Sequence, residues 1–256
     1  MSILESASAR QKIKDIEASC HLALQGKLSH VPSVPARDIQ VVGFKSLPAK
    51  KGLGFVEGRA RLLHDLASIE LQAMELGLRT LIEYPDAAME FREQLAEVTI
   101  DEGRHFELCL NSLEELGYRW GDWPVHLSLW KTVKQGESLM DRVLIVHRYL
   151  EGSGLDAGAK ILSRLKGLPV KDAAWSAMDR IHREEIGHVD FGSRWYRELC
   201  REQRVDSDLD FRERMTRLRE TLPYRTENLD RESRMKAGFT EAELIVLEDL
   251  RARILP

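Results

Sequence analysis

The sequence predicts an all-α protein built on a four-helix bundle with one long crossover. Three observations favour this fold class. Apolar residues recur with helical periodicity in four long segments, 57–83, 87–116, 137–166 and 171–203. Short turns join the first segment to the second and the third to the fourth, whereas residues 117–136 form a long connection. Two helical hairpins joined in this way are the arrangement that a bundle with one crossover requires.

The segments that flank the bundle are expected to pack on it. Residues 4–26 have the pattern of a short helix, and residues 31–54 contain three prolines and three glycines, which favours an extended strap. Helical patterns return at 206–221 and 240–253, with a polar linker between them. The predicted organisation is one globular unit with three parts: an N-terminal helix and strap (1–56), the bundle (57–203) and a C-terminal helical extension (204–256).

Turn residues set the limits of the four long helices. Pro85 and Asp86 separate the first two helices, Gly117 ends the second, and "KGLPV" turns the chain between the third and the fourth. The inward stripe of the first hairpin is expected to hold Leu63, Leu66, Ala73, Gly77 and Leu81, and then Phe91, Leu95, Val98, Cys109, Leu113 and Leu116.

Composition narrows the class of protein. The chain has 256 residues and a net charge of −4, without the basic excess expected of a nucleic-acid or anionic-membrane binder. No apolar stretch of about 18 residues could span a bilayer, and the N-terminus lacks the apolar core of a secretory signal. Three isolated cysteines suit reduced thiols. We therefore expect a cytoplasmic protein that does not bind membranes.

Two Glu-x-x-His motifs, one in each hairpin, are the strongest indication of chemistry. Glu102 and His105 share one face of the second helix, because residues three apart lie on the same side of a helix. Glu185 and His188 do the same in the fourth helix. Both pairs interrupt the apolar stripe of their helix, and a buried carboxylate is costly unless something compensates its charge.

The other helix of each hairpin supplies one more inward glutamate. Glu70 interrupts the stripe of the first helix and Glu151 that of the third. Glu70 and Glu102 lie about 15 and 17 residues from the turn of their hairpin, and Glu151 and Glu185 each lie about 17 residues from theirs, which is roughly 25 Å at the rise of an α-helix. The sequence therefore predicts that four carboxylates and two imidazoles meet in the middle of the bundle.

This set of residues predicts a site for two divalent metal ions. Two such ions neutralise four carboxylates, and mixed carboxylate and imidazole ligands suit two iron ions, two manganese ions or a Mn/Fe pair. One glutamate from each of two helices, with Glu-x-x-His from each of the other two, is the pattern of di-iron and di-manganese carboxylate proteins. The alternative is buried Glu–His hydrogen bonding without metal, which the repulsion among four carboxylates disfavours.

Three residues near the predicted ligands have more than one interpretation. Asp101 and Glu184 precede the ligand glutamates and either accept a hydrogen bond from a ligating histidine of another helix or remain solvated. His147, one turn before Glu151, is a second-shell group, an extra ligand or an ordinary core histidine.

Small residues directly follow Glu151 in the third helix. Gly152, Ser153 and Gly154 would leave room for dioxygen or substrate, or would allow a π-bulge of the kind found at functional sites. Close packing of two helices explains these glycines equally well.

Five stretches resemble a known family: "LLHDLASIELQAMELGL", "VTIDEGRHFELCLNSLEELGYRWGDWPVH", "YLEGSGLDAG", "EEIGHVDFGSRWY" and "ENLDRESRMKAGF". They resemble the ferritin-like di-iron carboxylate superfamily and, within it, the bacterial ferritin-like family known as domain of unknown function 455. "DEGRH" is also similar to the Asp-Glu-x-Arg-His motif of bacterial di-iron monooxygenases. The resemblance implies a ferritin-like bundle with a di-metal site but no particular reaction. Ser68 stands where many relatives are expected to have histidine, which leaves the six ligands intact and puts the outer shell in doubt.

Three classes of function remain open. The first is an oxygen-activating oxidoreductase of the hydroxylase or oxidase type, which would use dioxygen or peroxide, a small-molecule substrate and an electron donor that the sequence does not identify. A tRNA-modifying hydroxylase is a variant that the acidic balance disfavours. The second is a ferroxidase or peroxide-scavenging protein, and the third is a metal-binding protein without turnover. The flanking segments would cover the surfaces that a storage cage needs, so we expect a monomer or a small homo-oligomer.

Overall fold

The computed structural model describes residues 2–169, 171–225 and 227–252 of the chain. Over these ranges the ordered elements are helical, and the β-structure is limited to one isolated parallel bridge between Val41 and Val125. The all-α fold class predicted from the sequence is confirmed. The chain divides into two compact units, of which one comprises Met1–Lys131 with Arg164–Ala177 and the other Thr132–Ser163 with Met178–Pro256.

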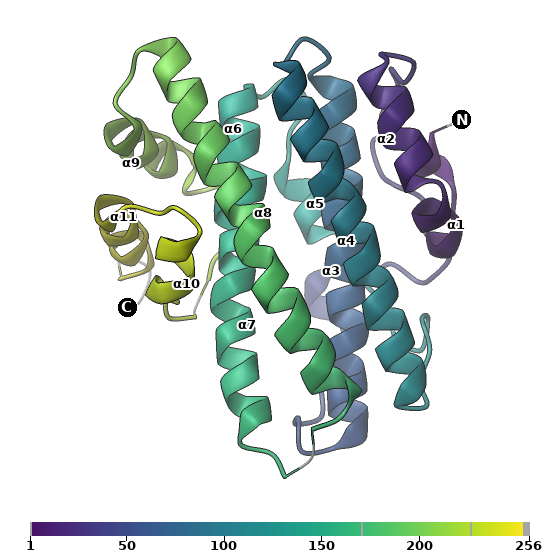
Figure 1. Ribbon diagram of the computed structural model, residues 1–256. Coiled ribbons are helices and arrows are strands. Elements are labelled where there is room, and N and C mark those ends of the chain that lie inside the picture. Colours follow the sequence, from purple (N-terminus) through teal and green to yellow (C-terminus); the bar gives the residue numbers. More distant parts are fainter. Residues whose placement is uncertain (1, 170, 226, 253–256) are drawn as a thin grey trace. The chain divides into compact units, whose positions relative to one another are not determined.

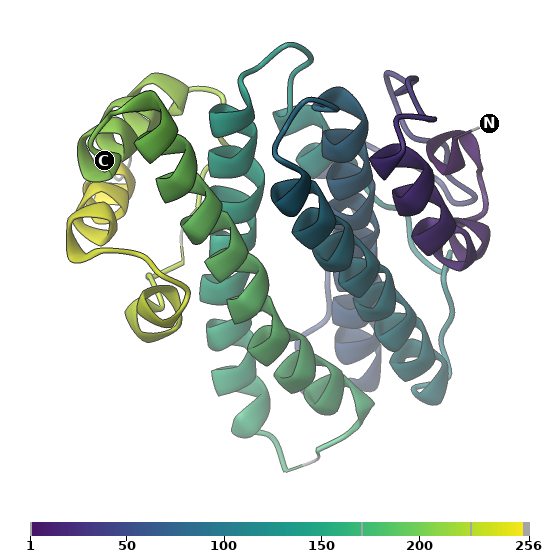
Figure 2. The ribbon, with the colours of Figure 1, turned by 45° about the horizontal axis from the view of Figure 1, so that its top comes forward.

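The first unit is built on α3 (Val56–Glu83) and α4 (Met89–Glu115), which pack along each other (Figures 1 and 2). Both helices begin and end within two residues of the predicted limits. They approach closely at Gly77, where an added Cβ atom would collide with the side chain of Thr99 on α4. After α4, Gly117 adopts a positive φ of 82°, the conformation that commonly ends a helix.

The N-terminal segment is broken where the sequence predicted one helix over 4–26. It consists of a short 3-10 turn, η1, and two helices that meet at Asp15, where φ is −102° and ψ is 2°. Ser8 accepts a hydrogen bond from the Gln11 N–H and fixes the start of α1. The three elements are η1 (Ile3–Glu5), α1 (Ala9–Lys14) and α2 (Ile16–Leu24), and α2 packs on both α3 and α4.

A buried ion cluster fastens α1 and the strap to α3. Glu75 accepts hydrogen bonds from Lys12 Nζ at 2.6 Å and from both terminal nitrogens of Arg37 at 2.6 and 2.5 Å. The side chains of Lys12 and Glu75 are fully buried. Beyond Arg37 the strap has no helix except the 3-10 turn η2 (Phe44–Ser46), in agreement with the extended segment predicted there.

The start of the long connection packs on the first unit through its tryptophans. Trp130 is buried in α5 (Ser128–Thr132), and its indole N–H donates to the Ser33 carbonyl at 2.9 Å. Trp120 stacks on His64 with ring centroids 4.9 Å apart, and the Gly121 N–H donates to His64 Nε2 at 3.2 Å. Burial lowers the pKa of His64 to about 4.

The second unit contains the third predicted helix in three consecutive parts. These parts are α6 (Leu139–Val143), a π-helical turn, η3 (Leu144–Leu150), and α7 (Glu151–Lys166). The last part is followed by α8 (Ala173–Gln203), which runs beside α7 in Figures 1 and 2. The glycine run after Glu151 suggested a possible π-bulge, and the π-helical turn lies directly before this residue.

The described residues of the C-terminal extension, 204–225 and 227–252, contain three helices where the sequence predicted two. They are α9 (Ser207–Leu218), α10 (Arg231–Lys236) and α11 (Glu241–Ala252). Helix α10 lies in what the sequence presented as a polar linker. Asp230 caps it by accepting a hydrogen bond from the Ser233 N–H, and Arg234 forms a fully buried ion pair with Asp156 of α7 at 2.7 Å. A tertiary contact therefore stabilises a helix that is too short to form alone.

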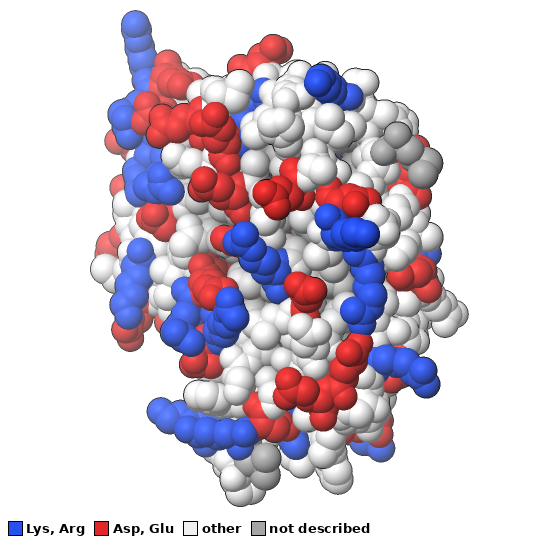
Figure 3. Space-filling model, turned by 45° about the vertical axis from the view of Figure 1, so that its right-hand side comes forward, with Lys and Arg blue, Asp and Glu red and all other residues white. Residues whose placement is uncertain are grey.

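The surface in Figure 3 carries Lys and Arg side chains intermingled with Asp and Glu, without a large area of one sign. Many of the exposed charges form pairs along one helix, as Arg180 does with Glu184. None of the described helices is long and apolar enough to cross a membrane.

Candidate metal centre

The first half of the candidate site lies on α3 and α4. Glu70, Glu102 and His105 are all at most 4% exposed. The Nδ1 atom of His105 lies 3.8 Å from a carboxylate oxygen of Glu70 and 3.7 Å from one of Glu102. Neither distance is a hydrogen bond. The helical repeat brings Glu102 and His105 to one face, and the packing of α3 on α4 adds Glu70.

The second half lies on α7 and α8 and repeats the contact within the Glu-x-x-His motif. The Nδ1 atom of His188 lies 3.4 Å from a carboxylate oxygen of Glu185, three residues earlier in α8. Both Glu-x-x-His motifs therefore turn Nδ1 of the histidine towards the glutamate. Glu151 is the first residue of α7, directly after the π-helical turn, and its side chain is 8% exposed.

Four of the six predicted ligands form a group that could hold a metal ion. They are Glu102, His105, Glu185 and His188, and one ligand atom from each lies within 4.8 Å of all the others. Bonds from an ion to carboxylate oxygen or imidazole nitrogen are about 2.0–2.2 Å long, so two ligands of one ion are at most roughly 4.4 Å apart. The Glu–His distances of 3.4 to 3.8 Å fall inside this limit. The donor chemistry, carboxylate with imidazole, suits iron or manganese.

His147 is tied to the second half by a hydrogen bond. Its Nδ1 atom lies 2.8 Å from a carboxylate oxygen of Glu151, one turn later. Its Nε2 atom is buried and has no hydrogen-bond partner among the residues that the structure describes. The ring packs edge-on against Phe191, and an added Cβ atom at Gly192 would lie only 2.6 Å from the Cβ atom of His147. Gly192 thus makes room for a histidine that fixes the orientation of Glu151.

Asp101 and Glu184 form ion pairs with arginines of their own helices. Asp101 pairs with Arg104, and Glu184 pairs with Arg180 at 3.0 Å. Their side chains are 41% and 44% exposed. A contact of either carboxylate with a ligating histidine stays a prediction.

The small residues after Glu151 have distinct surroundings. An added Cβ atom at Gly152 would lie 2.7 Å from Nη1 of Arg234, so the space beside this glycine is filled by a guanidinium group. Ser153 is buried, and its hydroxyl donates to the Tyr149 carbonyl at 2.6 Å. An added Cβ atom at Gly154 would meet nothing within 4 Å. Of the three residues, Gly154 has free space beside it, and access for dioxygen or substrate there stays a prediction.

Sequence reasoning did not find the buried charges that surround the second half. Asp156 lies five residues after Glu151, is fully buried, and accepts hydrogen bonds from Arg234 at 2.9 and 2.7 Å and from Arg251 at 2.7 Å. Hydrogen bonds from these arginines hold the pKa of Asp156 below its usual value although burial acts to raise it. The inward position of Asp156 on the third predicted helix indicated a buried carboxylate. The arginines that pair with it could not be identified, because they are distant in sequence.

The three cysteines are free thiols and buried. Burial raises the pKa of Cys109 well above its usual value, and the negative charge of Glu70 acts in the same direction. A protonated thiol is a poor metal ligand. Cys109 therefore fits its expected role as a small buried residue one turn after His105.

Comparison with known proteins confirms the family. A family model described as "Protein of unknown function (DUF455)" matches residues 5–245. An uncharacterized protein of Haemophilus influenzae is 34% identical over 220 residues, which is 80% of this chain and 72% of that protein. No solved structure matches the chain. The matched range contains all the candidate ligands and the helices that carry them, and the chain belongs to the DUF455 family.

Proposed function

We propose that the chain is a di-metal carboxylate protein with a ferritin-like four-helix architecture. Two iron ions, two manganese ions or one of each would be held by Glu70, Glu102, His105, Glu151, Glu185 and His188. The observation that carries this proposal is the group of four ligand atoms within 4.8 Å that the two Glu-x-x-His motifs provide. Each half of the site would add one more carboxylate to this group. Glu70 lies next to His105 in the first half, and Glu151 lies next to His147 in the second.

The residues of the chain have separable roles in this proposal. His105 and His188 would bind through Nδ1, the nitrogen that each turns towards its glutamate. The glutamates neutralise the ions, so the buried site carries no net charge. His147 holds Glu151 by its Nδ1 contact and so limits the positions that this carboxylate can take.

Bound ions of this kind would supply the redox chemistry for activating dioxygen and oxidising a small-molecule substrate. The protein supplies a dry, fixed set of ligands, as the low exposure of Glu70, Glu102 and His105 indicates. We favour this oxidoreductase reading over iron storage because α2 covers both α3 and α4 in the first unit. Storage cages assemble through the outer faces of their helices, and α2 occupies part of that surface.

Metal content after anaerobic loading with Fe(II) tests the site. We expect two iron ions per chain by elemental analysis. Glu102→Gln and Glu185→Gln should each lose at least one ion, because each removes a charged ligand. Glu107→Gln is the matched control, since Glu107 lies on the same helix as Glu102 but is exposed, and it should keep two ions. A wild-type protein that binds no iron overturns the site.

The reaction of the loaded protein with dioxygen separates the functions. An oxidoreductase should react slowly on its own and faster when its substrate is added, with a fixed amount of iron per chain. Continued uptake of Fe(II) into a ferric mineral would instead identify an iron-handling protein. Either outcome is followed by absorbance and oxygen consumption, with Glu102→Gln as the inactive reference.

A further inference from the structure

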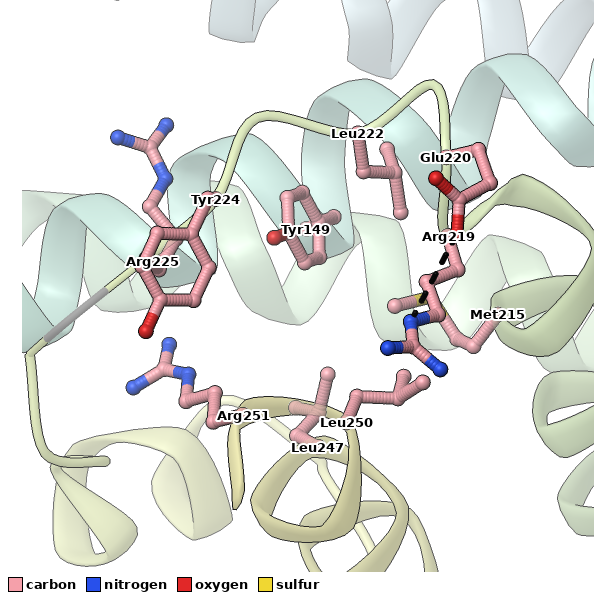
Figure 4. A pocket seen from close by; sticks show the side chains of 10 residues that line it. All are labelled: Tyr149, Met215, Arg219, Glu220, Leu222, Tyr224, Arg225, Leu247, Leu250 and Arg251. Atoms are coloured by element: carbon pink, nitrogen blue, oxygen red, sulfur yellow. Dashed lines mark ion pairs between the residues drawn. The ribbon is translucent and has the colours of Figure 1, made fainter. Parts of the chain in front are cut away.

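A pocket of about 290 Å³ lies in the second unit, and none of the six candidate metal ligands is among its lining residues (Figure 4). Its walls come from the end of α9, the loop that follows it, helix α11 and Tyr149 of the π-helical turn. A volume of this size fits one small organic molecule. Its lining combines an apolar wall with a concentration of positive charge, and this combination narrows the class of ligand.

Apolar side chains line two facing sides of the pocket. Met215, Leu222, Leu247 and Leu250 line it, and Figure 4 shows Leu247 and Leu250 on α11 facing Leu222 across the pocket. Met215 and Leu247 are buried in the core of the unit, at 1% and 3% exposure, so this wall is part of the packed structure.

Three arginines and one carboxylate line the same pocket. Arg251 is neutralised by Asp156 at 2.7 Å, and Arg219 lies 4.0 Å from Glu220, whose side chain is 91% exposed. Arg225 is different. Its Nε atom is buried and has no hydrogen-bond partner in the part of the chain that the structure describes.

The guanidinium of Arg225 is therefore poorly compensated. Burial lowers its pKa, and the nearby charge of Arg251 acts in the same direction, whereas the carboxylates of Glu227 and Asp156 only partly oppose this. Arginine stays charged even under these conditions. Arg225 is half-buried, and leaving its buried Nε–H without an acceptor is costly, so an anion bound beside it would offset that cost.

Figure 4 shows the charged lining residues at two ends of the pocket. Arg225, Tyr224 and Arg251 lie at one end, and Met215 lies at the other, beside the ion pair of Arg219 with Glu220. The Tyr149 hydroxyl donates to the Pro223 carbonyl at 2.7 Å, which holds the loop that carries Tyr224 and Arg225 in place. The pocket thus has one end with two arginines and no acidic lining residue, and a second end at which the arginine is paired with Glu220.

We propose that this pocket binds a small amphipathic organic anion, a carboxylate joined to an apolar chain. The carboxylate lies at the end formed by Arg225 and Arg251, and the apolar chain packs on Leu222, Leu247 and Leu250. The site does not depend on the proposed metal centre, because none of the six candidate ligands lines it. A test with the metal-free protein is therefore independent of the proposed function.

Titration calorimetry with decanoate tests the proposal, with decanol and acetate as probes of the two halves of the ligand. We expect one saturable decanoate site per chain and much weaker binding of decanol and of acetate. Arg225→Gln should weaken decanoate binding by roughly 10- to 100-fold, the range for losing a hydrogen bond to a charged group. The matched control is Arg231→Gln, because Arg231 belongs to the same extension but pairs with Glu241 and Glu248 outside the pocket.

Each outcome decides for or against the pocket. Arg225→Gln should fold, since it removes a half-buried and poorly compensated charge, and its circular dichroism spectrum and thermal midpoint check this. A second readout is the NMR resonance of the Arg225 Nε–H group, which is identified by its absence from the spectrum of Arg225→Gln. This resonance should shift when decanoate is added to the wild-type protein. No saturable decanoate binding, equal binding of decanol, or an unchanged affinity in Arg225→Gln would each overturn the proposal.

Discussion

The first and second units share an arrangement that reaches beyond the two Glu-x-x-His motifs. In each unit the helix that carries a lone candidate glutamate carries a second, fully buried carboxylate five residues later: Glu75 follows Glu70 and Asp156 follows Glu151. Each of these carboxylates receives two cations from segments outside the long helices. The cations are Lys12 and Arg37 in the first unit and Arg234 and Arg251 in the second.

The two units differ one turn from the candidate ligands. Leu66 precedes Glu70 at the position where His147 precedes Glu151, and only His147 hydrogen-bonds to its glutamate. Cys109 follows His105 at the position where Gly192 follows His188, and only Gly192 leaves space for a histidine. The buried carboxylate with its two cations is thus common to both units. The second half alone has His147, which positions Glu151, and Gly192, which leaves space for His147.

The largest effect on the free energy of unfolding is expected from removing either buried carboxylate, Asp156 or Glu75. Asp156→Ala leaves Arg234 buried without its partner, and breaking such a pair costs about 3–5 kcal/mol. Glu75→Ala should cost a similar amount, because it strands Lys12 and Arg37. Urea unfolding measures both values, with the exposed Asp249→Ala as the control that should change little. If either buried carboxylate can be removed at a cost below about 1 kcal/mol, it does not anchor the flanking segments.

Acid should destabilise the protein through His64, a buried histidine that, unlike His147, has no hydrogen-bonded carboxylate. Its pKa is lowered by burial to about 4, so the folded state keeps it neutral while the unfolded chain takes up a proton near pH 6.5. The stability from this residue is present above pH 6.5 and is lost as the pH falls to 4, by about 3 kcal/mol in total.

The difference in unfolding free energy between wild type and His64→Gln isolates this contribution. Glutamine can still accept the hydrogen bond from the Gly121 N–H, but it does not titrate. The difference should change with pH between 6.5 and 4 and be flat above 7. A difference independent of pH would show that His64 is not the acid-sensitive group.

The close approach of Gly192 to His147 gives the next effect. Gly192→Ala places a Cβ atom 2.6 Å from the Cβ atom of His147 and 3.0 Å from its backbone, so the helices must move apart at a cost of about 1–3 kcal/mol. Gly187→Ala on the same helix meets nothing within 4 Å and should stabilise the protein by about 0.5–1 kcal/mol. Thermal unfolding of the two variants tests this, and destabilisation of equal size in both would contradict it.

The smallest effect concerns metal affinity. His147→Leu removes the hydrogen bond that holds Glu151, and loss of a side chain that orients a metal ligand typically lowers metal affinity by about 10- to 100-fold. The number of ions per chain should stay at two at saturating metal. Competition with a chelator measures the affinity, and the exposed His30→Leu is the control. An unchanged affinity in His147→Leu would make the two halves equivalent.

Periodicity and turn residues were sufficient to locate the long helices. The predicted limits of α3 and α4 differ from the observed ones by at most two residues, because Pro85 and Gly117 act locally. The grouping of four candidate ligands was also predictable, since Glu102, His105, Glu185 and His188 are polar residues on apolar stripes at helical spacing.

Features that depend on distant partners could not be predicted. Helix α10 has six residues and a polar sequence, and its stability comes from the contact of Arg234 with Asp156. From the sequence alone, Glu75 is expected to be a solvated charge, because its partners Lys12 and Arg37 are distant in sequence. In each case the deciding neighbour lies far away along the chain.

The central claim is that the two Glu-x-x-His motifs are halves of one metal site. X-ray absorption spectroscopy of the iron-loaded protein tests it most directly. We expect a shell of oxygen and nitrogen ligands together with a distinct iron–iron scattering contribution, and Glu102→Gln should lose the iron–iron contribution while Glu107→Gln keeps it. Two iron ions per chain without any iron–iron scattering in the wild type would contradict the claim.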